Sequence, residues 1–251
     1  MCLLAFLGNM AVHAYDFDQN GIYYNITDAD ALTVEVTYVE DGEGNADFYY
    51  GAISIPRRIS TGGVSYTVTA IGDKAFNNCS DVTSVTIPNT VTSIGNDAFS
   101  GCSNLATITL PESVTSIGNS AFNSCSGLTS VTIPYSVTNI GGTPFPKCSG
   151  LTSIIVEEGN ANYDSRDNCN AIIETATNKL ITGCKNTIIP EGITTIGGWS
   201  FSFCTELTSI NIPKGVTSIE MAAFENCYAL ASVTIPNSVT IIEGYAFTGC
   251  I

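Results

Sequence analysis

Cysteine is the residue whose chemistry stands out first, because this chain of 251 residues has ten of them. Seven of them follow one another at intervals of 23 residues, except for one interval of 56 residues: Cys79, Cys102, Cys125, Cys148, Cys204, Cys227 and Cys250. Zinc requires four ligands that converge on one point, which a line of evenly spaced thiols cannot supply. The spacing favours a row of small buried thiols over laddered disulfides or a metal site, and we expect no cofactor.

Two further cysteines, Cys169 and Cys184, lie inside the 56-residue interval and flank a predicted β-hairpin. Its strands are Ala171–Glu174 and Lys179–Thr182, with a four-residue turn between them. If the residues next to the turn face each other, the same register places Cys169 opposite Cys184. A disulfide is one interpretation of this pair in an exported protein, and two free thiols are the other.

A pair of glutamates has the spacing of a catalytic acid and base. Glu220 and Glu243 occupy the same slot of adjacent repeats, so stacking would place them about 5 Å apart, as in a retaining glycosidase. No pocket or aromatic platform accompanies them in the sequence. A solvated pair on a turn is the favoured interpretation.

An acidic segment near the start resembles a calcium-binding loop. Residues 16–21, with Asp16, Asp18 and Asn20, match its first six positions, but position twelve is Thr27 where a bidentate Glu is required. A hairpin turn at Asn20 and the following glycine is the favoured explanation. The sequence therefore assigns no catalytic residue and no metal ligand.

Histidine content and charge exclude several functions. The single histidine is His13, in the N-terminal segment, and without it the chain can build neither a Ser-His-Asp triad nor a Cys-His pair. The net charge of −15 repels the phosphates of nucleic acids. We therefore expect a protein that is not an enzyme and does not bind nucleic acid.

Residues 1–14 have the pattern of a signal peptide, either complete or truncated at its start. An apolar run, Leu3–Leu7, is followed by Val12, His13 and Ala14, which fit the small-x-small pattern of a cleavage site. The basic region that normally precedes the apolar run is missing. The run is too short to span a bilayer, so we expect a secreted or cell-surface protein without a membrane span.

An internal repeat supplies the elements that must position these residues. Seven phenylalanines keep the same intervals as the cysteines: Phe76, Phe99, Phe122, Phe145, Phe201, Phe224 and Phe247. Strict alternation in Val131–Ile133 predicts a short strand with Val and Ile inward, which Pro134 ends. Residues 136–140 give a second alternating segment, and Ala-Phe-x-x-Cys predicts a short helical turn. A period of about 20 to 29 residues is typical of a leucine-rich-repeat solenoid.

The chain before the repeats has a different pattern. Within residues 15–65, the alternating segments 33–38 and 48–56 are joined by an acidic loop, 41–47. They predict a small antiparallel β cap that covers the edge of the first coil.

Residues 66–251 are predicted to form the solenoid itself, a strand-dominated fold of nominal α/β class with a parallel strand ladder and short helical turns. The 56-residue interval adds one coil of 33 residues, at about 157–190, which carries the hairpin. The chain stops one residue after Cys250, before the strand that would complete the last coil, so we expect the C-terminus to be incomplete.

The repeat unit, VTSIGxxAFxxCSxLTSVTIPxS, resembles the BspA-type leucine-rich repeat of bacterial surface proteins. The resemblance covers residues 66–250, and it implies export, a solenoid, and adhesion or protein recognition at the cell surface. It implies no catalytic residue. Glu220 and Glu243 depart from the pattern because they replace the glycine after Ile. Because glutamate disfavours a left-handed backbone, these departures indicate that the glycine is not needed there for a positive φ.

Large aromatic residues that break the repeat are the candidate binding anchors, because aromatic side chains dominate binding energetics: Tyr135, Trp199, Phe203, Tyr228 and Tyr245. The outward strand positions carry mainly small Thr and Ser, which discriminate poorly between partners. We expect binding to a protein of the host extracellular matrix or of a neighbouring cell surface. The alternatives are a structural spacer that presents other domains and, far less favoured, a carbohydrate-active enzyme.

Overall fold

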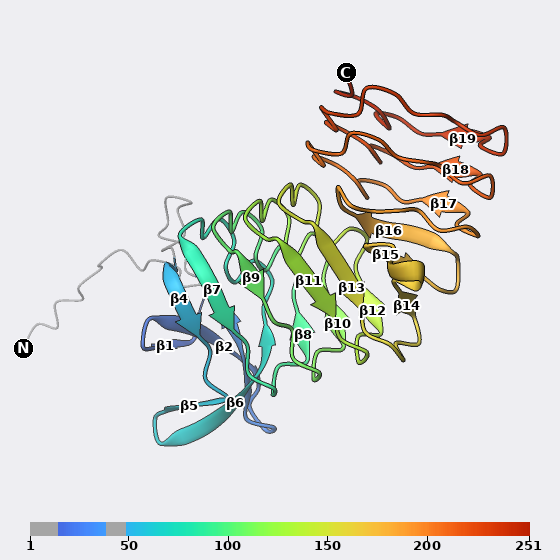
Figure 1. Ribbon diagram of the computed structural model, residues 1–251. Helices are drawn as coiled ribbons and strands as arrows, with labels where there is room; N and C mark the ends of the chain where they lie inside the picture. The colour runs from blue at the N-terminus through green and yellow to red at the C-terminus, as the bar shows by residue number, and fades with distance from the viewer. Residues whose placement is uncertain (1–14, 39–48) are drawn as a thin grey trace, which may run out of the picture.

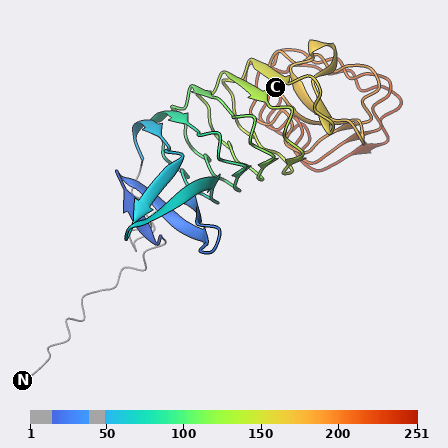
Figure 2. The ribbon, with the colours of Figure 1, turned by 90° about the horizontal axis from the view of Figure 1, so that it is seen from below.

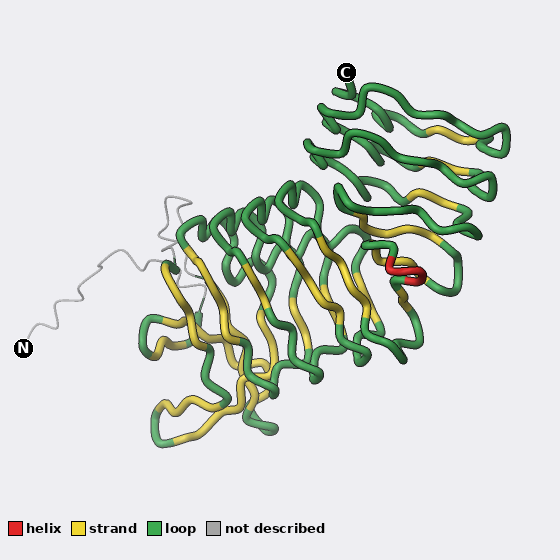
Figure 3. Tube along the Cα trace, in the orientation of Figure 1, coloured by secondary structure: helices red, strands yellow, loops and turns green. Residues whose placement is uncertain are grey.

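The computed structural model describes residues 15–38 and 49–251, which form one elongated stack of coils (Figure 1). The strands are short, and turns make up most of each coil (Figure 3). Among the described residues, no helix has the length and apolar character needed to cross a membrane. The predicted signal peptide with His13 and the acidic loop 41–47 lie outside the described residues.

Two ladders of short parallel strands run along the stack. The first contains β4 (Gly51–Ser54), β7 (Val82–Thr86), β9 (Thr107–Ile108), β11 (Ser130–Ile133) and β13 (Ser153–Val156). The second contains β8 (Ser93–Ile94), β10 (Ser116–Ile117), β12 (Asn139–Ile140), β17 (Thr195–Ile196), β18 (Ser218–Ile219) and β19 (Ile241–Ile242). From β7 and β8 onward, the paired strands of these ladders keep the register of the 23-residue repeat, as with Ser130 opposite Ser153. β4 differs, because its Ile53 lies opposite Val85 of β7. The predicted leucine-rich-repeat solenoid is confirmed.

Each coil buries the same set of apolar positions. In one coil, eight inward side chains are at most 2% exposed: Val114, Ile117, Ala121, Phe122, Cys125, Leu128, Val131 and Ile133. The threonines that alternate with them, such as Thr129 and Thr132, are exposed. The pattern of β-branched and small apolar residues is therefore what closes the coil.

The phenylalanines form two stacks of rings inside the solenoid. The first stack contains Phe76, Phe99, Phe122 and Phe145, and the second contains Phe201, Phe224 and Phe247. Centroids of successive rings lie 4.9–5.2 Å apart, and their planes are within 8° of parallel. Tyr49 of the cap closes the first stack, 4.6 Å from the ring of Phe76. One ring per coil therefore sets the distance between coils.

The segment around each phenylalanine, which we call the Phe turn, consists of tight turns where a short helical turn was predicted. Hydrogen bonds between residues three apart close it, such as that from the N–H of Cys79 to the carbonyl oxygen of Phe76 at 3.2 Å. The Phe turns have two slots with a left-handed backbone, occupied in this coil by Lys74 (φ 59°) and Asn78 (φ 58°). The turn of Phe145 is the exception, because only its second slot, Lys147 (φ 61°), is left-handed. The chain reverses there without a regular helix.

Backbone hydrogen bonds through the Phe turns join neighbouring coils. The N–H of Phe99 donates to the carbonyl oxygen of Ala121 at 2.7 Å, and the N–H of Gly101 donates to that of Asn123 at 2.7 Å. The glycine that precedes the turn is needed for this close approach, because a Cβ at Gly95 would lie 2.5 Å from the backbone nitrogen of the previous coil. Its φ is not left-handed, as predicted.

The cap is antiparallel, as predicted, but its pairing differs from the predicted one. It consists of β1 (Phe17–Gln19), β2 (Ile22–Asp28), β3 (Thr33–Thr37), β5 (Arg58–Thr61) and β6 (Val64–Ile71). β2 pairs antiparallel with β1 and β3, and β5 pairs antiparallel with β6. The two strands expected on either side of the acidic loop, β3 and β4, do not pair with each other. Each lies in a different ladder, β3 parallel to β6 and β4 parallel to β7, so together they form a first coil.

The predicted hairpin lies in the 33-residue coil. This coil contains β14 (Tyr163–Asp164), the 3-10 helix η1 (Arg166–Asn168), β15 (Ala171–Glu174) and β16 (Lys179–Gly183). β15 pairs antiparallel with β16, with the two residues next to the turn opposite each other as predicted. Ile172 and Ile181 pack into the core of the first coils, whereas Ile173 and Leu180 pack into the core of the last coils. The hairpin therefore separates two hydrophobic cores and contributes side chains to both.

The stack of Phe turns bypasses this coil. The N–H of Lys147 donates to the carbonyl oxygen of Ser202 at 3.3 Å, so the coils on either side of the hairpin are direct neighbours there. Gly183 stands in place of a phenylalanine, and a Cβ on it would lie 2.2 Å from Cε1 of Phe201. The hairpin coil is therefore inserted on one side of the stack and is absent on the side of the Phe turns, so it acts as a wedge. The stack accordingly turns, so that the first coils appear side by side and the last coils as nested loops (Figure 2).

Truncation of one stacked ring tests the packing. Phe122 is fully buried between Phe99 and Phe145, so we expect Phe122→Ala to lower the free energy of unfolding by about 3 to 5 kcal/mol. Denaturant unfolding followed by circular dichroism measures the change. A loss below about 0.5 kcal/mol, typical of surface substitutions, would place this ring outside the core.

Candidate functional site

Three of the predicted anchors lie on Phe turns of the last coils. Trp199 and Tyr245 occupy the first left-handed slot of their turns, with φ of 53° and 61°, and Phe203 occupies the second slot, with φ of 60°. Other coils fill these slots with residues such as Asp97 and Gly101. A left-handed backbone disfavours bulky side chains and suits Gly, Asn and Asp, so these aromatic residues cost folding free energy where they stand.

Trp199, Met221 and Tyr245 form a line of exposed apolar side chains on three successive coils, which we call the aromatic strip. Their residues are 41%, 42% and 68% exposed. The N–H of Trp199 donates to the carbonyl oxygen of Met221 at 3.0 Å, and the N–H of Ala222 donates to that of Gly244, so the three turns lie directly side by side. Sequence analysis missed Met221. The 23-residue register, which places it one residue before the slot of Trp199, could have found it.

Phe203 makes an intramolecular contact that the other anchors lack. The Nζ atom of Lys147 lies 5.1 Å from the centroid of its ring, which is cation–π distance. Lys147 belongs to the last coil before the hairpin, so this contact joins the two halves of the solenoid on the side of the Phe turns. Phe203 is only half-exposed and is therefore partly a structural residue.

The remaining predicted anchors lie apart from the strip. Tyr135 follows the proline that ends a first-ladder strand, in a coil before the hairpin, and its N–H donates to Oε2 of Glu157 at 3.0 Å. Tyr228 directly follows Cys227 at the end of a Phe turn. Both side chains are exposed. The structure thus brings two of the five predicted anchors, Trp199 and Tyr245, into one continuous surface.

Glu220 and Glu243 hold neighbouring coils together. Oε2 of Glu220 accepts the N–H of Gly198 at 2.9 Å, and Oε2 of Glu243 accepts the N–H of Met221 at 2.8 Å. Glu220 also forms an ion pair with Lys179 at 2.7 Å. Glu243 is exposed and Glu220 is partly exposed, but each carboxylate also binds the backbone of the preceding coil, which the expectation of a solvated pair did not include.

In the first half, shorter side chains join the coils in the opposite direction, because they accept an N–H of the following coil from the position after the glycine. Oδ1 of Asp73 accepts the N–H of Asn96 at 2.6 Å, and Oδ1 of Asn96 accepts the N–H of Asn119 at 2.9 Å. Sequence analysis missed this ladder, although the recurrence of Asp and Asn at the repeat period was visible. Polar residues in these slots satisfy backbone donors at the coil edge.

The calcium-like segment is a hairpin turn. Asn20 and Gly21, with φ of 55° and 74°, connect β1 to β2, and this pair of left-handed residues is typical of a two-residue hairpin. Oδ2 of Asp16 accepts the N–H of Ile26 at 2.7 Å, which fixes the turn. In the part of the chain that the structure describes, no three His, Cys, Asp or Glu residues gather as metal ligands.

The cysteine ladder is a ladder of hydrogen bonds. The thiol of Cys125 donates to the carbonyl oxygen of Phe99 at 3.1 Å, and the same bond to the preceding coil, 3.0–3.2 Å long, recurs at other positions: Cys102, Cys148, Cys227 and Cys250. Sequence analysis predicted burial but missed this bond. Burial raises the pKa of Cys79 to about 11 and that of Cys227 to about 12, so the thiols stay protonated.

Cys169 and Cys184 do not face each other. A bulge between Ile172 and Ile173 shifts the register of the hairpin by one residue, so that Ala171 pairs with Gly183. The thiol of Cys184 instead donates to the carbonyl oxygen of Asn170 at 3.6 Å. Both residues are buried free cysteines, and the predicted register is wrong beyond the bulge.

The coil repeat, the parallel ladders and the Phe turns define a leucine-rich-repeat solenoid. The family described as "BspA type Leucine rich repeat region" matches residues 69–182 and 172–251, in six copies. The chain belongs to this family of BspA-type leucine-rich-repeat proteins. No curated protein matches the chain.

Solved structures of bacterial leucine-rich-repeat proteins are similar to this chain. One from Bacteroides ovatus ATCC 8483 is 27% identical with a TM-score of 0.58, and the match covers 94% of this chain and 57% of that one. One from Eubacterium ventriosum ATCC 27560 is 26% identical with a TM-score of 0.59, over 90% and 66% of the two chains. A leucine rich cell surface protein from Faecalibacterium prausnitzii A2-165 is 25% identical with a TM-score of 0.53, over 94% and 80%.

Buried thiols predict loss of stability in alkali. Cys79 and Cys169 ionise near pH 9.0 in an ordinary environment, but burial raises the pKa of each to about 11 in the folded chain. The unfolded chain loses these protons first, so the free energy of unfolding falls between about pH 9 and pH 11, by on the order of 1 kcal/mol per pH unit for each thiol.

Urea unfolding at pH 8, 9.5 and 10.5 measures this slope. The control is the double variant Cys79→Ala and Cys169→Ala, in which we expect a shallower slope over the same range. Equal slopes in the two proteins would contradict protonated, buried thiols at these two positions.

Proposed function

We propose that this protein is exported and binds another protein at the cell surface through the aromatic strip of Trp199, Met221 and Tyr245. The observation that carries the proposal is that the aromatic residues are exposed although their left-handed backbone costs folding free energy. Two large aromatic residues occupy left-handed slots that other coils fill with small or polar residues, and they point outward. Strain of this kind is kept where function requires it.

The strip has the physical features of a binding hot spot. Trp and Tyr bring large apolar area at low conformational cost, and they are the residues that most often dominate protein interfaces. The exposed thioether of Met221 lies between them and adapts its shape to a partner. The exposed positions of the first-ladder strands carry mainly Thr and Ser, such as Thr129, Ser130 and Thr132, which add little binding energy.

Leucine-rich-repeat proteins generally bind proteins, and this supports a protein partner. The description of the Faecalibacterium prausnitzii relative as a cell surface protein, together with the predicted signal peptide, supports export. We propose a partner in the extracellular matrix of a host or on a neighbouring cell. The net charge of −15 argues against nucleic acid.

No catalytic role forms part of the proposal. Glu220 and Glu243 are engaged with backbone amides, and the thiols are buried and protonated. A protein that only presents other domains would need no exposed aromatic strip. The role of spacer is therefore the alternative outcome of the test below.

Trp199 is the one tryptophan of the chain, so its fluorescence reports on the strip directly. Immobilised matrix proteins and intact neighbouring cells provide the binding assay. We expect Trp199→Ala to weaken binding about 30-fold, roughly 2 kcal/mol, as for an interface hot spot. Ala222 occupies the same left-handed slot one coil later, so this substitution suits the backbone and the fold is retained.

Tyr50→Ala is the matched control, because Tyr50 is an exposed aromatic residue that directly precedes β4, at the other end of the stack from β17, β18 and β19 (Figure 1). It should leave binding unchanged, and saturating partner should shift the emission of Trp199. Binding that survives Trp199→Ala and Tyr245→Ala would refute the strip as the site. Absence of any binding to matrix or cells would favour the spacer.

A further inference from the structure

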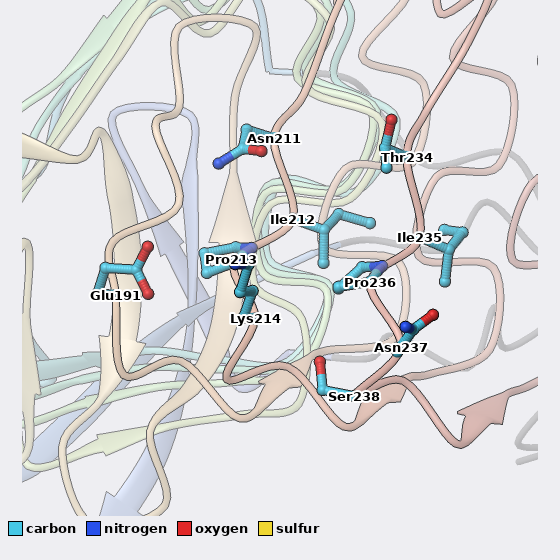
Figure 4. A pocket seen from close by; sticks show the side chains of 10 residues that line it. All are labelled: Glu191, Asn211, Ile212, Pro213, Lys214, Thr234, Ile235, Pro236, Asn237 and Ser238. Atoms are coloured by element: carbon cyan, nitrogen blue, oxygen red, sulfur yellow. The ribbon is translucent and has the colours of Figure 1, made fainter.

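A groove of about 770 Å³ lies on the other corner of the last coils, where the prolines end the first-ladder segments (Figure 4). The residues that line it are Glu191, Asn211, Ile212, Pro213, Lys214, Thr234, Ile235, Pro236, Asn237 and Ser238. Figure 4 shows the two proline rings side by side in the middle, with polar side chains around them. None of the predicted anchors lines this groove.

The groove lies where side-chain bonds between earlier coils have no counterpart. In the first half, Ser113 and Ser136 fold back onto the preceding coil, and their Oγ atoms donate to the carbonyl oxygens of Val91 and Val114 at 2.6 and 2.7 Å. Gly215 stands in the equivalent slot of one coil here, and Ser238 stands in that of the next coil, where its Oγ atom has no partner. Neither residue therefore makes the bond that Ser113 and Ser136 make.

The polar side chains of the groove are unused by the fold. Among the described residues, no hydrogen bond or ion pair involves the side chains of Asn211, Lys214, Thr234, Asn237 or Glu191. The Oγ atom of Ser238, which lines the same groove, is buried and has no partner. The side chains of Asn211, Lys214, Thr234, Asn237 and Glu191 are exposed, so their polar groups are accessible to a ligand. The Oγ atom of Ser238 alone in this set departs from the rule that buried polar groups have a partner.

The 33-residue coil has an asparagine near this corner whose side chain the fold does use. Near the equivalent corner of the 33-residue coil, Asn160 donates through Nδ2 to the carbonyl oxygens of Pro134 and Val137, at 3.0 and 2.9 Å. That amide holds two coils together. Within the described part of the chain, the side-chain amides of Asn211 and Asn237 make no such bond.

We propose that this groove binds a neutral oligosaccharide. Side-chain amides donate and accept hydrogen bonds together, as sugar hydroxyls do, and Asn211 and Asn237 are supplemented by the hydroxyls of Thr234 and Ser238. Pro213 and Pro236 offer apolar rings against which the C–H face of a sugar can pack. The volume lies in the range of about 300 to 1,000 Å³ typical of small-ligand sites.

Charge and backbone chemistry favour a sugar over the other ligand classes. Glu191 and Lys214 carry opposite charges, so the groove has no net charge for an ionic ligand. An extended peptide that adds to a sheet edge needs backbone N–H donors, and two residues in the middle of the groove are prolines, which have none. The proposal is independent of the protein-binding role of the aromatic strip.

Titration of the full chain with neutral oligosaccharides tests the proposal. Maltotriose, cellotriose, mannotriose and chitotriose, each at up to millimolar concentration, are followed by calorimetry and by saturation-transfer NMR. We expect at least one of them to bind, and Asn237→Ala to weaken its binding at least tenfold. Asn89→Ala is the matched control, because Asn89 occupies the same slot of an earlier coil and should leave binding unchanged.

Gly215→Ser adds a side chain directly after Lys214, which lines the groove, and removes no exposed amide. A Cβ on Gly215 would lie 3.1 Å from the carbonyl oxygen of Ile193, so the new hydroxyl should donate to it as Ser113 does to Val91. We expect this variant to fold normally and to lose sugar binding.

Two outcomes would overturn the proposal. One is the absence of binding by all four sugars, and the other is binding that neither Asn237→Ala nor Gly215→Ser weakens. A neutral hexapeptide of alternating Thr and Val, tested in parallel, identifies the competing case. If it binds in the groove and no sugar does, the groove recognises peptides and the proposal is wrong.

Discussion

The distance between one coil and the next governs everything else in this structure. Phenylalanine rings stacked about 5 Å apart fill the interior, and backbone bonds between Phe turns set the same spacing at the edge. Each turn must then reverse within a few residues, and in most turns one left-handed residue stands on each side of the ring. Five cysteine thiols complete this contact, because each of them donates to the carbonyl oxygen of a phenylalanine in the coil before it.

The functional surfaces arise where this regular arrangement changes. The hairpin coil enters only one side of the stack, so Gly183 replaces a phenylalanine, the solenoid turns and a second core begins. Beyond that point, Trp199 and Tyr245 take left-handed slots and project outward, and a groove opens at the proline corner, around Pro213 and Pro236. Both surfaces that we propose for binding therefore lie in the second half, one on the Phe turns and one on the proline corner.

Periodicity made most of the fold predictable. A single coil repeated at 23 residues specifies which residues face inward, and the hairpin of the modified coil follows from its own turn. What the pattern could not supply were features that depend on a single residue's geometry. One bulge after Ile172 moves Cys184 away from Cys169, and β3 and β4 enter separate ladders although they alternate alike. The anchors were visible as departures from the repeat, and the 23-residue register could have added Met221, whereas the groove required coils placed side by side.

Continuity of the stack across the hairpin is the central claim, and Gly183 tests it most directly. A Cβ there would overlap the ring of Phe201, so we expect Gly183→Ala to lower the free energy of unfolding by about 1 to 3 kcal/mol, as overpacking of a core does. Gly244→Ala is the control, because a Cβ on Gly244 meets nothing within 4 Å and should change stability by no more than about 0.5 kcal/mol. Equal stability of the two variants in denaturant unfolding would contradict direct packing of the second stack on the hairpin.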